Sequence, residues 1–119
     1  MMKVLVINTV RFKLNGISAV IKNYYQAMNK KDIQMDFMAI DVPIDEYRCF
    51  FEKNNLRCFV ICKKNIISYF LKIMKLCRDE KYDIVHIHGN SANMAIELLA
   101  VALGGAKIRI AHSHNTATI

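Results

Sequence analysis

The sequence predicts an α/β fold in which helices cover both faces of an open parallel sheet with strand order 3-2-1-4-5. Three observations support this prediction. Short β-branched runs alternate along the chain with longer segments of helical periodicity. The chain has 119 residues, 54% of them apolar, which suits one domain, residues 1–119, with its own core. One proline and four glycines are too few for a disordered or linker-like chain.

The elements follow from hydrophobic periodicity. Residues 3–7, KVLVI, are apolar on both faces from Val4 onward, as expected of an interior parallel strand. Apolar side chains then recur at three- and four-residue intervals over residues 17–28, which predicts a helix with Ser18 as a candidate N-cap. The same reasoning predicts strands at 34–40, 57–62, 82–88 and 107–112, and helices at 45–54, 66–80 and 91–103.

The predicted helix 91–103 ends at Gly104 and Gly105 and is apolar nearly all round, so we expect it to be buried between the sheet and another layer. Helical segments between the strands imply right-handed crossovers. In a Rossmann-like sheet of this order, the winding reverses between the first and fourth strands, and ligands bind at the carboxyl ends there. Loops 8–16 and 88–91 should therefore form the site.

The formal net charge of +7 suits an anionic partner. No zinc-finger spacing, RNA-binding strand motif or basic heptad helix is present, so nucleic acid is not expected as a partner. Phosphate on a small ligand or a lipid would satisfy the same charge. One basic region stands out in the sequence, consisting of Lys63, Lys64, Lys72, Lys75 and Arg78.

The cysteines indicate a reducing environment. Cys49, Cys58, Cys62 and Cys77 form no CxxC pair, so we interpret them as reduced core thiols rather than as a zinc or redox site. The sequence shows no secretory signal, and its longest apolar stretch, residues 94–106, is shorter than the ~20 residues of a membrane span. We therefore expect a cytosolic protein, with the inner face of the membrane as a place of contact.

Polar clusters follow three predicted strands, and two of them contain all four histidines of the chain. His86 and His88 lie two residues apart, as do His112 and His114, so each pair should project from one face of its strand. We expect the first ring of each pair to be a core residue and the second, nearer the strand end, to be functional. A metal site is disfavoured because no acidic partner is nearby and separate strands would have to converge.

Gly16 precedes the first predicted helix and would let a ligand approach the free amides at the helix start, although an ordinary turn glycine is equally compatible with the sequence. The dinucleotide fingerprint GxGxxG and the phosphate loop GxxxxGK[ST] are both absent. A nicotinamide enzyme and a P-loop nucleotidase are therefore disfavoured.

The segments KVLVINT, NGISAVIKNYYQAM and YDIVHIHGNSANMAIELLAVALGGAKIRIAHSHNT resemble the amino-terminal domain of family-4 glycosyltransferases of the GT-B fold. The likeness is to bacterial enzymes of capsular, exopolysaccharide or lipopolysaccharide assembly and is most specific over residues 82–116. It implies a retaining hexosyltransferase that uses a UDP- or GDP-linked sugar as donor substrate, without a further cofactor. The amino-terminal domain of such enzymes mainly holds the carbohydrate or lipid-linked acceptor.

The resemblance also assigns roles to particular residues. Asn15 and Gly16 would lie beside the donor diphosphate. His114, followed by Asn115, would line the pocket of the reacting sugar and act as the catalytic histidine. The end of the fourth strand, which would face the same cleft and bind substrate, consists of His88, Gly89 and Asn90.

The sequence lacks the carboxyl-terminal half of such an enzyme, including the glutamate-containing motif that binds the donor. We therefore expect a fragment or truncated product without transferase activity of its own. An alternative from a different class is a non-catalytic, flavodoxin-like binding module that docks through its basic region on an anionic surface.

Overall fold

A computed structural model describes residues 2–9, 16–28, 31–89 and 94–113 of the chain. Five parallel strands form one sheet in the order β3-β2-β1-β4-β5, which confirms the predicted α/β fold and strand order. The chain alternates strand and helix throughout, as a Rossmann-like fold requires. The elements are β1 (Met2–Asn8), α1 (Gly16–Ala27), β2 (Ile33–Ala39), α2 (Asp45–Lys53), β3 (Cys58–Val60), α3 (Ile66–Glu80), β4 (Ile84–Gly89), α4 (Ala95–Leu103) and β5 (Ile108–Ser113).

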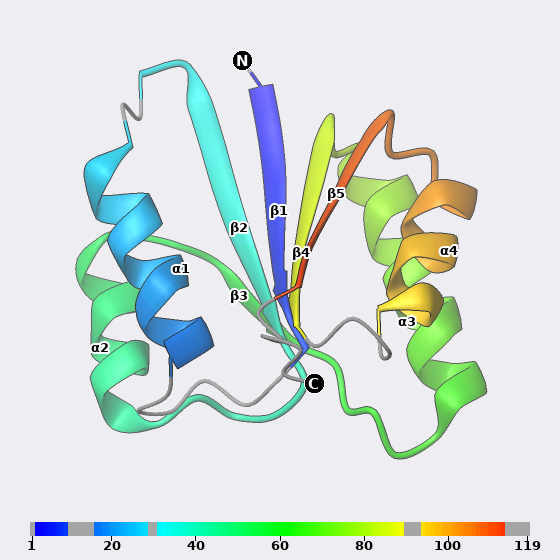
Figure 1. The fold of residues 1–119 in the computed structure, drawn as a ribbon, viewed down its shortest axis with the longest axis horizontal. Coiled ribbons are helices and arrows are strands. Elements are labelled where there is room, and N and C mark those ends of the chain that lie inside the picture. Colours follow the sequence, from blue (N-terminus) through cyan, green and yellow to red (C-terminus); the bar gives the residue numbers. More distant parts are fainter. Residues whose placement is uncertain (1, 10–15, 29–30, 90–93, 114–119) are drawn as a thin grey trace, which may run out of the picture.

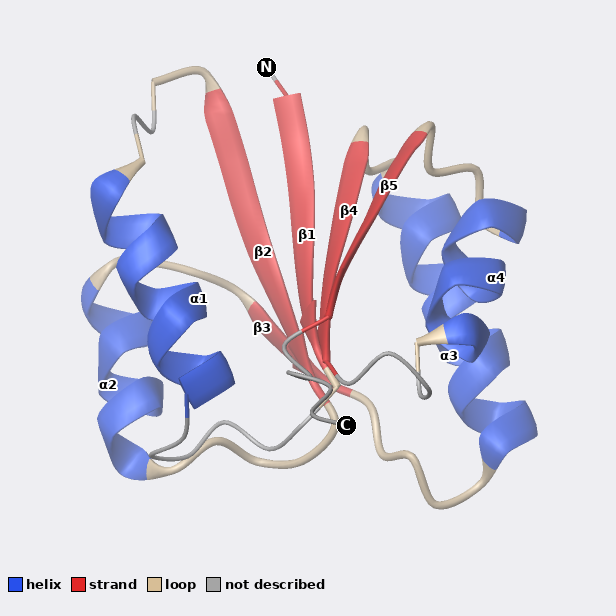
Figure 2. Cartoon of the chain, in the orientation of Figure 1, coloured by secondary structure: helices blue, strands red, loops and turns tan. Residues whose placement is uncertain are grey.

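The helices form two layers around the sheet. Helices α1 and α2 lie on one side, and α3 and α4 lie on the other (Figure 1). The chain runs from β1 through β2 to β3 in one direction and then crosses to β4 and β5 in the other, so right-handed connections place the two pairs of helices on opposite faces of the sheet. All five strands run the same way, so their carboxyl ends share one edge (Figure 2).

The core is divided by the sheet into two apolar clusters. Successive β1 residues alternate between them, because side chains of a strand point to opposite faces. Val4 and Val6 pack with Ile21 and Tyr25 of α1, whereas Leu5 and Ile7 belong to the cluster that contains α3 and α4. Residues on the α1 and α2 side also include Phe37, Ala39, Tyr47, Phe50 and Phe51.

Local signals explain the bounds of α3. The Asn65 side chain accepts a hydrogen bond from the Ser68 backbone N–H at 3.1 Å and caps the amino end. Lys81 adopts the left-handed conformation at the carboxyl end, with φ of 55°. The helix therefore spans the predicted residues 66–80.

Several element predictions were wrong in detail. Ser18 is not an N-cap, because α1 begins at Gly16 and Ser18 is already inside its first turn. The strand predicted at 57–62 is only three residues long, Cys58–Val60. The predicted helix 91–103 begins at Ala95, and it is not buried all round, since Leu99 and Leu103 are more than half exposed. The prediction failed because the outer face of α4 is apolar, which the sequence analysis interprets as a sign that a further layer covers the helix.

The cysteines are free, as expected, but only some belong to the core. Cys77 is buried, whereas Cys49 and Cys62 are exposed, which corrects the prediction of four core thiols. Burial raises the pKa of Cys77 to about 12, so this thiol stays protonated and unreactive near neutral pH. Among the described residues, no helix combines the length and apolar character that crossing a membrane requires.

Candidate functional site

The ends of β1 and β4 are joined where the winding of the sheet reverses. Asn8 is in register with His88 in the parallel ladder. One residue later, the backbone N–H and the hydroxyl of Thr9 both donate to the His88 carbonyl, at 3.0 and 2.9 Å. Two donors on one carbonyl hold the strand ends together, so the predicted crevice has a fixed floor.

The first turn of α1 is tied to the same place. The side-chain amide of Asn8 donates to the Ser18 hydroxyl at 3.2 Å, and both residues are fully buried. Gly16, which was predicted to precede the helix, is the first residue of α1. The positive dipole end of α1 therefore lies close to the β1 terminus, an arrangement that favours an anionic group.

Gly89 allows this close approach of the strand ends. A Cβ atom at Gly89 would lie only 1.9 Å from the Thr9 hydroxyl oxygen and 3.1 Å from the Thr9 Cβ. The missing side chain is thus required for the hydrogen bond between Thr9 and His88. The sequence analysis selected Gly89 as a ligand-binding residue, and the structure gives it a packing role.

Three of the four histidines gather on one face of the sheet. The ring centroids of His86 and His88 are 4.1 Å apart and stacked, and that of His112 lies 5.7 and 5.2 Å from them. These rings project from the face that α1 and α2 cover, because Val85 and Ile87 between them belong to the opposite apolar cluster. The strands therefore do converge, contrary to one reason for which the sequence analysis disfavoured a metal site.

The accessibility of the rings differs from the expectation. His88 was expected to be the functional ring and His86 and His112 the core residues, but His88 is 2% exposed while the other two are half-buried. His88 lies on the interior strand β4, between β1 and β5, whereas His112 lies on β5, the last strand of the sheet. His88 and His86 instead line a partly open pocket of about 170 Å³ between α1 and the sheet.

Four predicted site residues lie outside the residues that the structure describes. They are Asn15, Asn90, His114 and Asn115. Of the predicted site, the described part contains Gly16, His88 and Gly89, all at the carboxyl edge of the sheet near the junction of β1 and β4.

A buried carboxylate on the other side of the sheet was missed by sequence reasoning. Glu97, in the first turn of α4, is fully buried, and its Oε2 accepts from the Tyr69 hydroxyl at 2.6 Å and from Lys63 Nζ at 3.0 Å. Burial, and then the hydrogen bond to Glu97, raise the pKa of Tyr69. The available signal was a single acidic residue inside an otherwise apolar helix.

This pair also changes the interpretation of the basic region. Lys63 was grouped with four other basic residues, but its ammonium group is bound to Glu97. The members that remain at the surface are Lys64, Lys72, Lys75 and Arg78.

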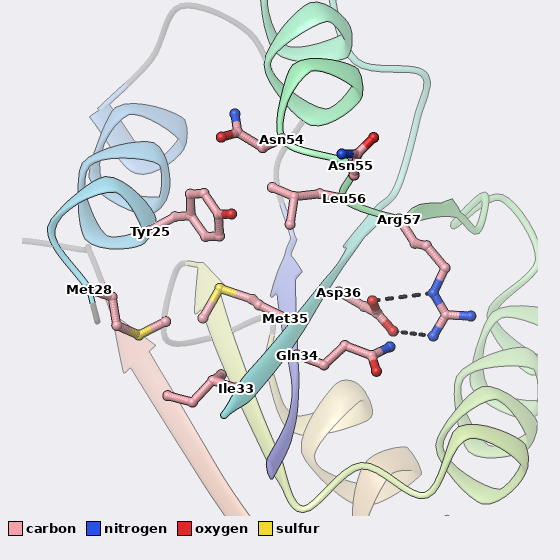
Figure 3. Close-up of a pocket in the computed structure, with 10 residues that line it drawn as sticks. All are labelled: Tyr25, Met28, Ile33, Gln34, Met35, Asp36, Asn54, Asn55, Leu56 and Arg57. Atoms are coloured by element: carbon pink, nitrogen blue, oxygen red, sulfur yellow. Dashed lines mark hydrogen bonds and ion pairs between the residues drawn. The ribbon is translucent and has the colours of Figure 1, made fainter. Parts of the chain in front are cut away.

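A further pocket with polar residues in its lining is separate from this site. A pocket of about 410 Å³ lies where β2 and β3 begin, at the opposite edge of the sheet, and is lined by Asp36 and Arg57 among others (Figure 3). The buried Asp36 carboxylate accepts from Arg57 at 2.5 Å and from the Tyr82 hydroxyl at 2.6 Å. These bonds satisfy its oxygens internally, so the pocket offers no free acid or base from this pair.

A pH dependence follows from the rest of this ion network. Glu80 accepts from Arg57 at 2.7 Å and from Lys3 at 3.0 Å, and these hydrogen bonds lower the pKa of Glu80. A carboxyl with a lowered native pKa stabilises the fold above its ordinary pKa, and this contribution is lost as the pH falls towards the native value. We expect Glu80→Gln to cost up to about 1 kcal/mol at neutral pH, the upper value for such partly exposed pairs.

The measurement is urea denaturation of wild type and Glu80→Gln between neutral pH and pH ~3, followed by circular dichroism because the chain has no tryptophan. The difference should vanish at the acid end. Glu52→Gln, an exposed glutamate on α2, is the matched control. A difference that stays constant with pH would show that the ion pairs of Glu80 do not stabilise the fold.

Comparison with known proteins finds no match to this chain among protein-family models, curated proteins or solved structures.

Proposed function

We propose that this chain is the acceptor-side domain of a glycosyltransferase of the GT-B type. The reaction is the transfer of a hexosyl group from a UDP- or GDP-linked donor to a growing or lipid-linked polysaccharide. The sequence resemblance over residues 82–116 is the origin of this proposal. The observation that carries it in the structure is the joined end of β1 and β4, with the first turn of α1 held beside it.

The chemistry suits that arrangement. A departing nucleoside diphosphate carries negative charge, which helix amides and a helix dipole stabilise without moving during the reaction. Gly16 at the start of α1 would leave those amides accessible, and Asn15 would lie beside the same diphosphate. His88 is almost fully buried and lines the pocket between α1 and the sheet. We therefore assign His88 a role in supporting the crevice rather than in contacting the substrate.

The residues that would contact the reacting sugar come from the resemblance. His114 would be the catalytic histidine, and Asn90 and Asn115 would hydrogen-bond to substrate. Transfer of this kind depends on positioning two sugars and stabilising the leaving group.

The test uses the polypeptide encoded by the whole reading frame that contains this sequence. Purified protein is incubated with radiolabelled UDP- and GDP-sugars and with bacterial membranes as the source of acceptor. We expect label in a polysaccharide or lipid-linked product. The turnover of His114→Ala should fall by at least about tenfold, because a general acid or base typically contributes about 100-fold or more. Lys107→Ala, an exposed residue at the opposite edge of the sheet, is the control.

Two outcomes would contradict the proposal. One is the absence of transfer from every nucleotide sugar tested. The other is unchanged turnover in His114→Ala. Circular dichroism of both variants separates a loss of activity from a loss of fold.

A second candidate function, docking on an anionic membrane surface, is favoured by the outer face of α3. Ile67 is 73% exposed and Leu71 is 50% exposed, although both are large and apolar. They share a shallow groove with Lys72 and Lys75 on the same helix. Apolar side chains flanked by lysines suit the surface of a bilayer of anionic lipids. Each lysine or arginine near such a surface contributes about 1 kcal/mol to binding.

Co-sedimentation with vesicles of phosphatidylcholine, with and without phosphatidylglycerol, tests this candidate. Binding should require the anionic lipid and fall at high salt. The double substitution Lys72→Glu and Lys75→Glu should abolish it, whereas Lys53→Glu on α2, which is also exposed, should not. Binding that ignores the lipid charge would exclude docking of this kind.

A further inference from the structure

The cluster of His86, His88 and His112 has the composition of a transition-metal site. Each residue offers one imidazole nitrogen, and these nitrogens all lie within 4.8 Å of one another. Two of the rings come from alternate positions of β4, and the third comes from the residue of β5 that is in register with His88. Two neighbouring strands therefore direct three neutral nitrogen donors to one point above the sheet.

We propose that these three histidines bind a divalent d-block ion such as Zn²⁺. Three histidine nitrogens are a sufficient protein ligand set for zinc, with a fourth position left to water or another exogenous ligand. The acidic partner whose absence counted against a metal in the sequence analysis is therefore not needed. Among the described residues, the cluster contains no carboxylate or thiolate, so the fourth ligand comes from outside this set.

The geometry needs only a small contraction. Zinc–nitrogen distances of about 2.0–2.1 Å in a tetrahedral site place the ligand nitrogens about 3.4 Å apart. Rotation of the rings of His86 and His112 can supply this change, because both are half-buried at the less covered side of the sheet. His88 is fixed between its neighbours and serves as the anchor of the set.

Aromatic and apolar side chains adjoin the histidine cluster. Tyr24 of α1 contacts His86 edge to face at 6.2 Å, and apolar residues such as Val6 and Ile21 line the adjoining pocket. A metal ion binds imidazole only through a deprotonated nitrogen, so its affinity for this cluster should fall in acid.

The ion would also join two strands. His112 lies on β5, the outermost strand, whose Ile108 and Ile110 are about half exposed. A metal bridge from β5 to β4 stabilises the native state only when the ion is bound. Metal binding does not depend on sugar transfer, so the metal titration and the transfer assay test separate proposals.

The test is a titration of the purified, reduced chain with Co²⁺ and then Zn²⁺. We expect visible absorption bands of cobalt in a nitrogen and oxygen environment, saturating at one ion per chain and displaced by Zn²⁺. The thermal midpoint should rise with either ion. A near-ultraviolet thiolate-to-cobalt band would mean that the ion is held by cysteines, and would overturn the proposal.

The variants are chosen to keep the fold. His112→Asn and His86→Asn change half-buried rings, and the buried His88 is left in place. Each should weaken cobalt binding by more than about 100-fold, since removing even a group that supports a metal ligand costs about 10–100-fold. Ile110→Ala, two residues before His112 on β5, is the control and should bind as wild type.

Circular dichroism of the metal-free variants confirms that each one is folded. Retained cobalt bands in folded His112→Asn and His86→Asn would show that these rings are not ligands. A wild-type chain with no cobalt bands and no rise in thermal midpoint would equally overturn the proposal.

Discussion

Replacing Glu97 by alanine is expected to lower the free energy of unfolding by about 3 kcal/mol, the lower value for breaking a buried ion pair. The carboxylate is fully buried and accepts from both Lys63 and Tyr69. Lys63 can turn to water because its side chain is 25% exposed, but the fully buried Tyr69 hydroxyl cannot. The variant therefore leaves a buried donor without its acceptor.

The measurement is urea denaturation followed by circular dichroism, with two companion variants. Glu97→Gln should cost less than Glu97→Ala, because an amide oxygen can still accept from Tyr69. Glu52→Ala, on an exposed helix face, should change stability by less than about 0.5 kcal/mol. If Glu97→Ala were as stable as this control, the buried carboxylate would not contribute to folding.

Replacing Gly89 by alanine is expected to destabilise the fold by about 1–3 kcal/mol, the usual cost of overpacking. The new methyl group would lie 1.9 Å from the Thr9 hydroxyl, which must rotate away. The hydroxyl then loses its bond to the His88 carbonyl, while the backbone N–H of Thr9 keeps its own. The effect should thus combine steric displacement with the loss of one buried hydrogen bond.

A double-mutant cycle separates these contributions. Thr9→Ala removes the clashing oxygen and leaves the Thr9 Cβ 3.1 Å from the new methyl group. Gly89→Ala should therefore cost less in the Thr9→Ala background than alone, by at least about 0.5 kcal/mol. Strictly additive effects would mean that the two side chains do not interact.

Most of the fold could be predicted because hydrophobic periodicity reports it directly. The β-branched run of β1 and the 3.6-residue pattern of α1 and α3 are local signals, and crossover handedness then limits the sheet order. The error at α4 had a physical cause. An apolar pattern does not distinguish a helix buried on all sides from one whose Leu99 and Leu103 face outward.

The site was harder to predict because it depends on contacts between distant segments. Strand periodicity placed His86 and His88 on one face, but only the register of β5 against β4 brings His112 to them. The backbone carbonyl of His88 is bound by Thr9, 79 residues earlier in the chain. Likewise, nothing local to Glu97 indicates that Tyr69 and Lys63 bind it.

The central position of β1 has a consequence for synthesis of the chain. One side of β1 pairs with β2 soon after both emerge, but its other side waits for β4, as the hydrogen bond between Lys3 and Asp83 across 80 residues shows. Closing so long a loop costs chain entropy, which slows pairing. On the ribosome, one edge of β1 therefore stays unpaired until β4, Ile84–Gly89, has been translated, and a chaperone would have that interval in which to bind it.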